Sequence, residues 1–523
     1  MAVLKFLLGS KFQSRRSNLA IKYMVEFLMK VLLLYPEFPD TFWSFRHALP
    51  FLGRRSAYPP LGLLTVSALL PPHWKRKLVD LNVEKLRDKD LAWADVAFLS
   101  AMLVQGPFLS RLIARCREAG LRTVVGGPIT SADPSSYEKA DHAVRGEAEG
   151  VMEELAFDLE AGNARRLYEA AGRADMTKVP PPDLRLARLR RYSSIPIQYS
   201  RGCPFSCEFC DVIELFGRTH RTKTAEQVLQ ELEQIYGMGW RGSVFVVDDN
   251  FVGNKPALKA LLPRLEEWMR VHGDPFSLFT QASINMAEDD ELLSLMQAAR
   301  FNRVFVGIET PSKDCHRAAG KMQNVKADLL ASVRRIQEHG MEVMGGFIVG
   351  FDQDSPEIFD KQIAFIKEAA IPVSMVGLLT ALPNTRLWRR LSEEGRLLRQ
   401  SMGDNTAALL NFIPRMNPEA LLAGYRKVLS SIYSPKEYFE RAQAMLNRLG
   451  ARPAPRLVLS DYLALCRSFV RQGIFARYRV AYWRFLGKTF LRTPRHLGLA
   501  VTLAIMGHHF FTLTRRMETE TLK

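Results

Sequence analysis

The sequence has few cysteines and no uninterrupted apolar run long enough to span a membrane. Six cysteines in 523 residues are too few for a disulfide scaffold, which favours a reducing compartment. The longest apolar run, residues 497–513, contains Gly507, His508 and His509 and is short for a span. Residues 1–28 have no convincing secretory cleavage pattern and are expected to be an N-terminal extension. These features predict a cytoplasmic protein.

Acidic residues are scarce in the C-terminal tail. Between Arg441 and Lys523 there are fifteen Lys and Arg but three Asp and Glu, so this segment carries twelve of the chain's net charge of +17. Basic residues flanking an apolar run, with Trp483 and Phe485 nearby, are typical of a helix lying on a membrane surface. We therefore expect peripheral membrane contact through the tail. The alternative is a C-terminal helix docked on the body of the protein.

The first part of the chain alternates short apolar runs with helical patterns. Hydrophobic and charged contents of 47% and 24% are those of a folded protein, and the length suits two or three domains. The expected strands are 30–36, 77–82, 95–101, 122–128 and 142–147, and the expected helices lie near 61–70, 106–119 and 147–161. This alternation predicts an α/β fold, with a doubly wound, Rossmann-like parallel sheet over residues 29–161.

A second alternation begins after a proline- and arginine-rich linker, residues 162–194. Its expected strands are 195–201, 243–250, 276–284, 303–310, 342–351 and 372–382, each followed by a helical pattern. Six such units predict a partial (β/α)6 barrel of the TIM type over residues 195–397, open at one side. Residues 398–523 are expected to form a helical C-terminal region.

Three cysteines directly follow the first barrel strand. Cys203, Cys207 and Cys210 have the spacing C-x3-C-x2-C, which suits zinc or an iron–sulfur cluster. Zinc needs a fourth ligand, for which only His220 and Cys315 are candidates. A [4Fe–4S] cluster held by three thiolates instead leaves one iron open to a small molecule. The other two cysteines, Cys116 and Cys466, are expected to be buried.

The stretch RGCPFSCEFC (201–210), combined with the six-unit pattern, resembles the cluster motif of radical S-adenosylmethionine (SAM) enzymes. The resemblance implies that SAM completes the cluster and is split to methionine and a 5′-deoxyadenosyl radical. It also implies an electron donor such as flavodoxin or ferredoxin. The SAM-binding candidates that it gives are Phe209, Asp248, Asp249, Ser283, Asn285, Glu309, Gly346 and Gly350. The alternative for the Asp248–Asn250 run is a helix cap, which suits Asn250 best.

The N-terminal sheet joined to such a barrel resembles the cobalamin-binding domain of B12-dependent radical SAM enzymes. The cobalamin candidates are Pro60, Gly62, Leu63, Ser100, Gln105, Gly126, Gly127, Pro128, Gly146 and Glu147. The motif D-x-H-x-x-G, whose histidine ligates cobalt in many B12 proteins, is missing, so the resemblance implies cobalt without a protein histidine. Gln105 is a candidate for the lower face of cobalamin, and a hydrogen bond within its loop is the alternative.

The resemblance implies methylation of an unactivated carbon in a small-molecule or lipid substrate. Similar domain order occurs in enzymes that methylate hopanoid lipids. Cobalamin-dependent ring closure or rearrangement without methyl transfer is the alternative within the family. A zinc-containing nucleic-acid-binding protein is the alternative from another class. It would need four close ligands and exposed aromatics among its basic residues, so nucleic-acid binding is not expected.

Overall fold

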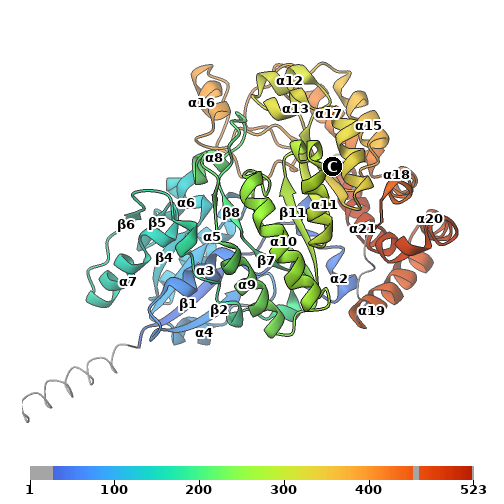
Figure 1. The fold of residues 1–523 in the computed structure, drawn as a ribbon. Helices are drawn as coiled ribbons and strands as arrows, with labels where there is room; N and C mark the ends of the chain where they lie inside the picture. The colour runs from blue at the N-terminus through green and yellow to red at the C-terminus, as the bar shows by residue number, and fades with distance from the viewer. Residues whose placement is uncertain (1–27, 452–458, 521–523) are drawn as a thin grey trace, which may run out of the picture.

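The computed structural model describes residues 28–451 and 459–520. It has an N-terminal α/β part, a central barrel and a C-terminal helical part (Figure 1). Nearly all of the expected N-terminal extension, 1–28, lies outside the described residues. The predicted α/β fold class is confirmed.

Six parallel strands form the first sheet, in the order β2-β1-β3-β4-β5-β6. They are β1 (Lys30–Tyr35), β2 (Lys75–Asp80), β3 (Val96–Ser100), β4 (Arg122–Gly126), β5 (His142–Arg145) and β6 (Leu167–Glu169). The four central residues of β1 are buried, as expected for a strand covered on both faces. The short β6 lies in the expected linker and was not predicted.

The two faces of this sheet carry separate apolar clusters. Helices α3 (Leu61–Leu69) and α7 (Met152–Ala161) share one cluster with Val31 and Leu33. Helix α5 (Gly106–Glu118) shares the other with Leu32 and Leu34. Alternate side chains of β1 therefore hold helices on opposite faces, which is the doubly wound arrangement.

The second sheet is also parallel, in the order β14-β13-β12-β11-β10-β7. Its strands are β7 (Ser194–Ile197), β10 (Gly242–Val246), β11 (Phe276–Ala282), β12 (Phe301–Glu309), β13 (Glu342–Val349) and β14 (Ser374–Leu378). The helices that follow them are α9 (Ala225–Gly237), α10 (Lys255–Val271), α11 (Asp290–Ala298), α14 (Leu329–Glu338) and α15 (Ile358–Glu368). Within the described part of the chain the first and last strands are not paired, so the barrel is open, as predicted.

The C-terminal part consists of helices. They are α16 (Arg386–Glu393), α17 (Pro418–Ile432), α18 (Pro435–Arg448), α19 (Leu459–Ser468), the π-helical turn η9 (Phe469–Phe475), α20 (Arg479–Arg492) and α21 (Leu497–Glu520). Residues Pro494–Glu518 are long and apolar enough to cross a membrane, but 67% of their most apolar window is buried. Phe510 stacks on Phe42 with ring centroids 4.6 Å apart. Helix α21 is therefore docked on the body of the protein.

The two isolated cysteines differ in exposure. Cys116 is buried on α5, as predicted. The prediction for Cys466 was wrong, because its side chain is exposed. On α19 the buried face carries Ala464, whereas Cys466 is two residues further on and points to the other side of the helix.

Candidate active site

The three-cysteine motif forms a loop beyond the carboxyl end of β7. The loop runs from β8 (Ser200–Arg201) to α8 (Val212–Phe216). Gly202 has φ +91, and an added Cβ would lie 2.4 Å from Thr219 O, so only glycine fits there. The Glu208 N–H donates to Ala319 O at 2.9 Å, and the Leu387 N–H donates to Glu208 O at 2.8 Å. A barrel residue, Ala319, and a residue of α16, Leu387, thus both anchor the loop at Glu208.

The loop offers three thiols to a metal group and no fourth ligand. Burial raises the pKa of Cys203, Cys207 and Cys210, so a metal group would displace protons on binding. Within the described residues, no three Cys, His, Asp or Glu side chains converge on a point where one metal ion could sit. A cubic cluster does not need this convergence, because each thiolate binds a different iron. The donor set therefore fits a three-thiolate [4Fe–4S] cluster.

Both candidate fourth ligands for zinc have other partners. His220 Nε2 lies 2.9 Å from Asn250 O and 3.0 Å from Ser200 Oγ. Cys315 Sγ donates to Asp354 Oδ1 at 3.2 Å. The structure thus gives no support to a four-ligand zinc site at the motif.

The two aspartates after β10 have different surroundings. Asp248 is fully buried and accepts hydrogen bonds from Tyr199 N (2.8 Å) and Ser200 Oγ (2.5 Å); burial raises its pKa to about 6. Asp249 lines the large cavity described below, and burial together with the charge of Asp248 raises its pKa to about 7. Of the two carboxylates, Asp249 is therefore the one placed to meet a ligand.

Asn250 is not a helix cap. The cap of α10 is Asn254, whose Oδ1 accepts from Ala257 N at 3.2 Å. Asn250 instead accepts hydrogen bonds from the backbone N–H and hydroxyl of Ser283, and its amide nitrogen lies 3.8 Å from Cys203 Sγ. The Ser283 hydroxyl is also 2.6 Å from Asn285 Oδ1. The ends of β10 and β11 are thus joined to the three-cysteine loop, called the cluster loop below.

Glu309 lies on another side of the loop, in a strained backbone position. Its φ is +64, which is uncommon outside glycine and typical of functional sites. Its buried carboxylate is 2.5 Å from Lys321 Nζ, and Lys321 Nζ lies 5.9 Å from the centre of the Phe209 ring. The charge of Lys321 also opposes the effect of burial on the pKa of Cys207. Lys321 thus joins Glu309 and Phe209 to the cluster loop, and no local sequence signal marks it.

The two predicted glycines of β13 and its loop occupy tight positions. A Cβ on Gly346 would lie 2.8 Å from the Phe305 ring. Gly350 has φ +104, and its N–H donates to Asp354 Oδ2 at 2.8 Å. Next to it, Phe351 packs edge-on against Phe209 with ring centroids 6.0 Å apart. Gly350 therefore lies close to the Phe209 side of the loop, whereas Gly346 makes room for a ring inside the barrel.

A cavity of about 1790 Å³ lies between the first sheet, the open barrel and the C-terminal helices. This exceeds the volume of a pocket for one drug-sized molecule, roughly 300–1,000 Å³, so two ligands can share it. The predicted cobalamin residues that line it are Pro60, Gly62, Leu63, Ser100, Gly127, Pro128, Gly146 and Glu147.

Gln105 and Gly126 are not among the lining residues. The Gln105 side chain is fully buried, donates to Pro36 O at 2.8 Å and accepts from Met102 N at 2.9 Å. This is the loop hydrogen bond that the sequence left as the alternative. Met102 and Val104 line the cavity instead.

Gly127 brings the backbone to the cavity wall at the end of β4. Its φ is +93, and a Cβ there would lie 2.5 Å from Ser100 Oγ and 2.9 Å from Ala101 O. Any side chain at this position would displace the loop that contains Ser100 and Ala101. The backbone of Gly127 therefore reaches the cavity wall without a side chain. A backbone turn without a side chain, at the wall of a large cavity, leaves room for a bulky, flat cofactor such as cobalamin.

Glu147 forms a buried ionic contact between the two α/β parts. Its carboxylate is 2.6 Å from Arg221 and 3.4 Å from Arg201, and Arg201 also lies 2.7 Å from Glu149. Burial alone would raise the pKa of Glu147, but the Arg221 and Ala174 N–H donors and the two guanidinium charges lower it. Arg201 precedes Gly202 and the three motif cysteines, so this contact joins the loop after β5, in the first α/β part, to the three-cysteine loop. The sequence did not predict this role.

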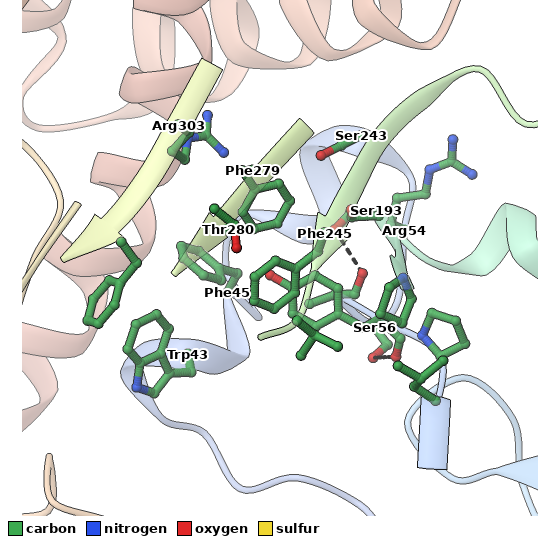
Figure 2. A pocket seen from close by; sticks show the side chains of 18 of the residues that line it. Trp43, Phe45, Arg54, Ser56, Ser193, Ser243, Phe245, Phe279, Thr280 and Arg303 are labelled. Carbon is green, nitrogen blue, oxygen red and sulfur yellow. Dashed lines mark hydrogen bonds between the residues drawn. The ribbon is translucent and has the colours of Figure 1, made fainter. Parts of the chain in front are cut away.

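Aromatic side chains from the barrel and from the N-terminal α/β part line the cavity together (Figure 2). Phe245 and Phe279 stack with centroids 4.5 Å apart, and Tyr58 lies 5.1 Å from Phe245. Trp43 packs edge-on against Phe305 at 5.0 Å. These residues come from distant parts of the chain, so no local pattern marks them. The resulting wall suits an apolar ligand.

Comparison with known proteins gives family matches for all three parts. The B12 binding domain matches residues 53–156, the radical SAM superfamily matches 197–366, and a domain of unknown function (DUF4070) matches 385–522. An uncharacterized methyltransferase of Synechocystis sp. is 39% identical, covering 92% of this chain and 91% of its own. A hopanoid C-2 methylase of Rhodopseudomonas palustris is 34% identical, covering 93% and 94%.

Solved structures share the fold. The cobalamin-dependent SAM radical enzyme OxsB matches with a TM-score of 0.61 at 15% identity, over 96% of this chain and 81% of its own. The radical SAM methyltransferase TsrM from Kitasatospora setae, with cobalamin and a [4Fe–4S] cluster bound, matches with a TM-score of 0.56 at 18% identity, over 76% and 84%.

Proposed function

We propose that this chain, which belongs to the cobalamin-dependent radical SAM methyltransferases, methylates a carbon atom of a hopanoid-type lipid. The enzyme class and its three cofactors, a [4Fe–4S] cluster, SAM and cobalamin, follow from the family. The lipid substrate is our proposal. Its support is the hopanoid C-2 methylase at 34% identity, together with the character of the cavity.

The observation that carries the proposal is the single cavity shared by three parts of the chain. The turn at Gly127, from the first sheet, and Asp249, from the barrel part, both line it. The aromatic residues and the apolar side chains of α21, including Val501, Ile505 and Met506, line the same cavity. The apolar part of this lining suits a large substrate without charge.

When bound, cluster and SAM supply the radical that removes a hydrogen atom from the substrate, and cobalamin supplies the methyl group that replaces it. The protein's contribution is to hold SAM, the substrate and cobalamin in fixed positions relative to one another. We assign the SAM site to Phe209, Glu309 and Asp249, with Lys321 fixing the Glu309 carboxylate. We assign the cobalamin site to the lining residues around Gly127, and positioning of the two sides to Glu147 and Arg201.

The test is transfer of a labelled methyl group. Anaerobically reconstituted enzyme, a chemical reductant and deuteriomethyl SAM would be incubated with detergent-solubilised hopanoid. We expect a product three deuterium atoms heavier in its methyl group, measured by mass spectrometry. A rearranged product without the label would favour the ring-closing alternative, and an unchanged lipid would contradict the proposed substrate class.

Asp249 predicts a pH dependence of SAM binding. Its pKa of about 7 means that the carboxylate is neutral below this pH and charged above it. SAM is cationic, so its affinity should rise with pH and be about tenfold weaker at pH 6 than at its plateau. Asp249→Asn should flatten this profile, measured by equilibrium dialysis of the anaerobic enzyme. Asp404→Asn, also in the cavity lining, is the control, and an unchanged slope in the Asp249→Asn variant would refute the assignment.

Two partners complete the proposal. A reductive cleavage needs one electron per event, which we assign to a flavodoxin or ferredoxin of the cytoplasm. Peripheral contact with a membrane, through the basic C-terminal part, would bring the enzyme to a lipid substrate. The buried free thiols fit a reducing compartment.

A further inference from the structure

The outer face of α19, η9 and α20 is apolar, although it faces solvent. Leu491 is 81% exposed and Phe475 is 77% exposed. We call this face the plate. Its exposed apolar residues are Tyr462, Leu463, Phe469, Val470, Ile474, Phe475, Val480, Trp483, Phe490 and Leu491. Ten exposed apolar side chains within one short segment, with Phe469 packed on Trp483 at 5.3 Å between ring centroids, point to an interaction site.

Basic side chains are interleaved with the plate. Between Leu459 and Arg492 the sequence has seven Lys and Arg and one acidic residue, Asp461. Asp461 lines the cavity, whereas Arg484 and Lys488 are exposed on the same side of α20 as Trp483 and Leu491. A segment with many exposed apolar side chains, seven cations and one acid matches an anionic bilayer surface. A second copy of the chain would bring like charges together.

The inner face of the same segment lines the cavity. Ala464 and Leu465 of α19 belong to the lining, as does Tyr462, which is 54% exposed. Across from α19, the lining continues along Leu49 and Leu52 of α2 (Leu49–Leu52) and the first turns of α21. Arg467 donates to Phe51 O at 2.9 Å and holds α19 beside α2. Figure 1 shows α19 and α20 together at the edge of the molecule, with α2 beside α19.

We propose that the plate docks on an anionic membrane and that the lipid substrate enters the cavity between α19, α2 and α21. This inference rests on the proposed function. It adds the surface that binds the membrane and the route by which the lipid enters the cavity. The plate lies directly outside the helix that closes the cavity, so a lipid leaving the bilayer there would pass from one apolar environment to another.

The test uses full-length holoenzyme with vesicles of phosphatidylglycerol, or of phosphatidylcholine, carrying hopanoid. We expect flotation with phosphatidylglycerol vesicles and much weaker flotation with phosphatidylcholine. Phe475→Glu combined with Leu491→Glu should reduce vesicle binding and methylation of vesicle-borne hopanoid by at least about tenfold. Methylation of detergent-solubilised hopanoid should stay within about twofold of wild type, because both side chains lie outside the cavity lining.

Phe157→Glu is the matched control, since Phe157 is 71% exposed on α7, away from the plate. Leu465→Glu tests the route: the variant should bind vesicles but fail to methylate the lipid in them, with iron and cobalamin contents unchanged. The inference is overturned if the plate variant floats like wild type, or if it changes a dimer to a monomer in light scattering. If the wild-type enzyme binds vesicles but does not methylate hopanoid in detergent, the proposed function is wrong. The membrane-docking role of the plate would still be supported.

Discussion

Cys207→Ala is expected to abolish SAM cleavage and methyl transfer while cobalamin binding persists. Cys207 is buried on the cluster loop, with the Gln323 amide 3.8 Å from its sulfur. Without one of three thiolates the cluster cannot be held at full occupancy. Iron should fall from about four per chain to below about one. Both reactions should drop on the order of 10³-fold or more, because they require the electron that the cluster delivers.

The measurements are iron and cobalamin content after anaerobic reconstitution, and 5′-deoxyadenosine formed from SAM. Cys466→Ala is the control, because Cys466 is an exposed thiol on α19 outside the cavity lining. It should keep full iron and full activity. A Cys207→Ala enzyme that still binds four irons would show that the motif does not carry the cluster.

The sheets were predictable because several of their strands, such as β1, β13 and β14, are buried over most or all of their length. The central residues of β1, Val31–Leu34, are all apolar, and such runs are visible without any tertiary information. The three-residue β6 was missed because Leu167–Glu169 has only one buried residue, Tyr168. Its pairing with β5 depends on the sheet edge already being there.

Individual roles in the site were less predictable than its location. The motif residues lie where strand ends meet, as the pattern implied. However, Gln105 and Asn250 turned out to hold backbone and side chains in place. Glu147 likewise meets two arginines from the barrel part. These contacts join residues distant in sequence, and one sequence carries no signal for such pairs.

Gly127→Ala is expected to remove cobalamin while leaving the cluster intact. The new Cβ would lie 2.5 Å from Ser100 Oγ, and φ of +93 disfavours any side chain. The turn must move, and the cavity wall moves with it. We expect cobalamin affinity to weaken by about a hundredfold or more, measured by absorbance titration with hydroxocobalamin. Iron should remain at about four per chain, and SAM should still be cleaved without methyl transfer.

Gly120→Ala is the control that separates the effect of backbone strain from the effect of moving the cavity wall. Gly120 has φ +69 in the same domain, but no atom lies within 4 Å of the added Cβ. If Gly120→Ala binds cobalamin normally and Gly127→Ala does not, the close approach at the cavity wall is the cause. Equal losses would mean that the domain is merely destabilised, and full binding by Gly127→Ala would place cobalamin elsewhere. Because Cys207→Ala should lose the cluster and keep cobalamin, the two variants together test whether the two cofactors are bound independently.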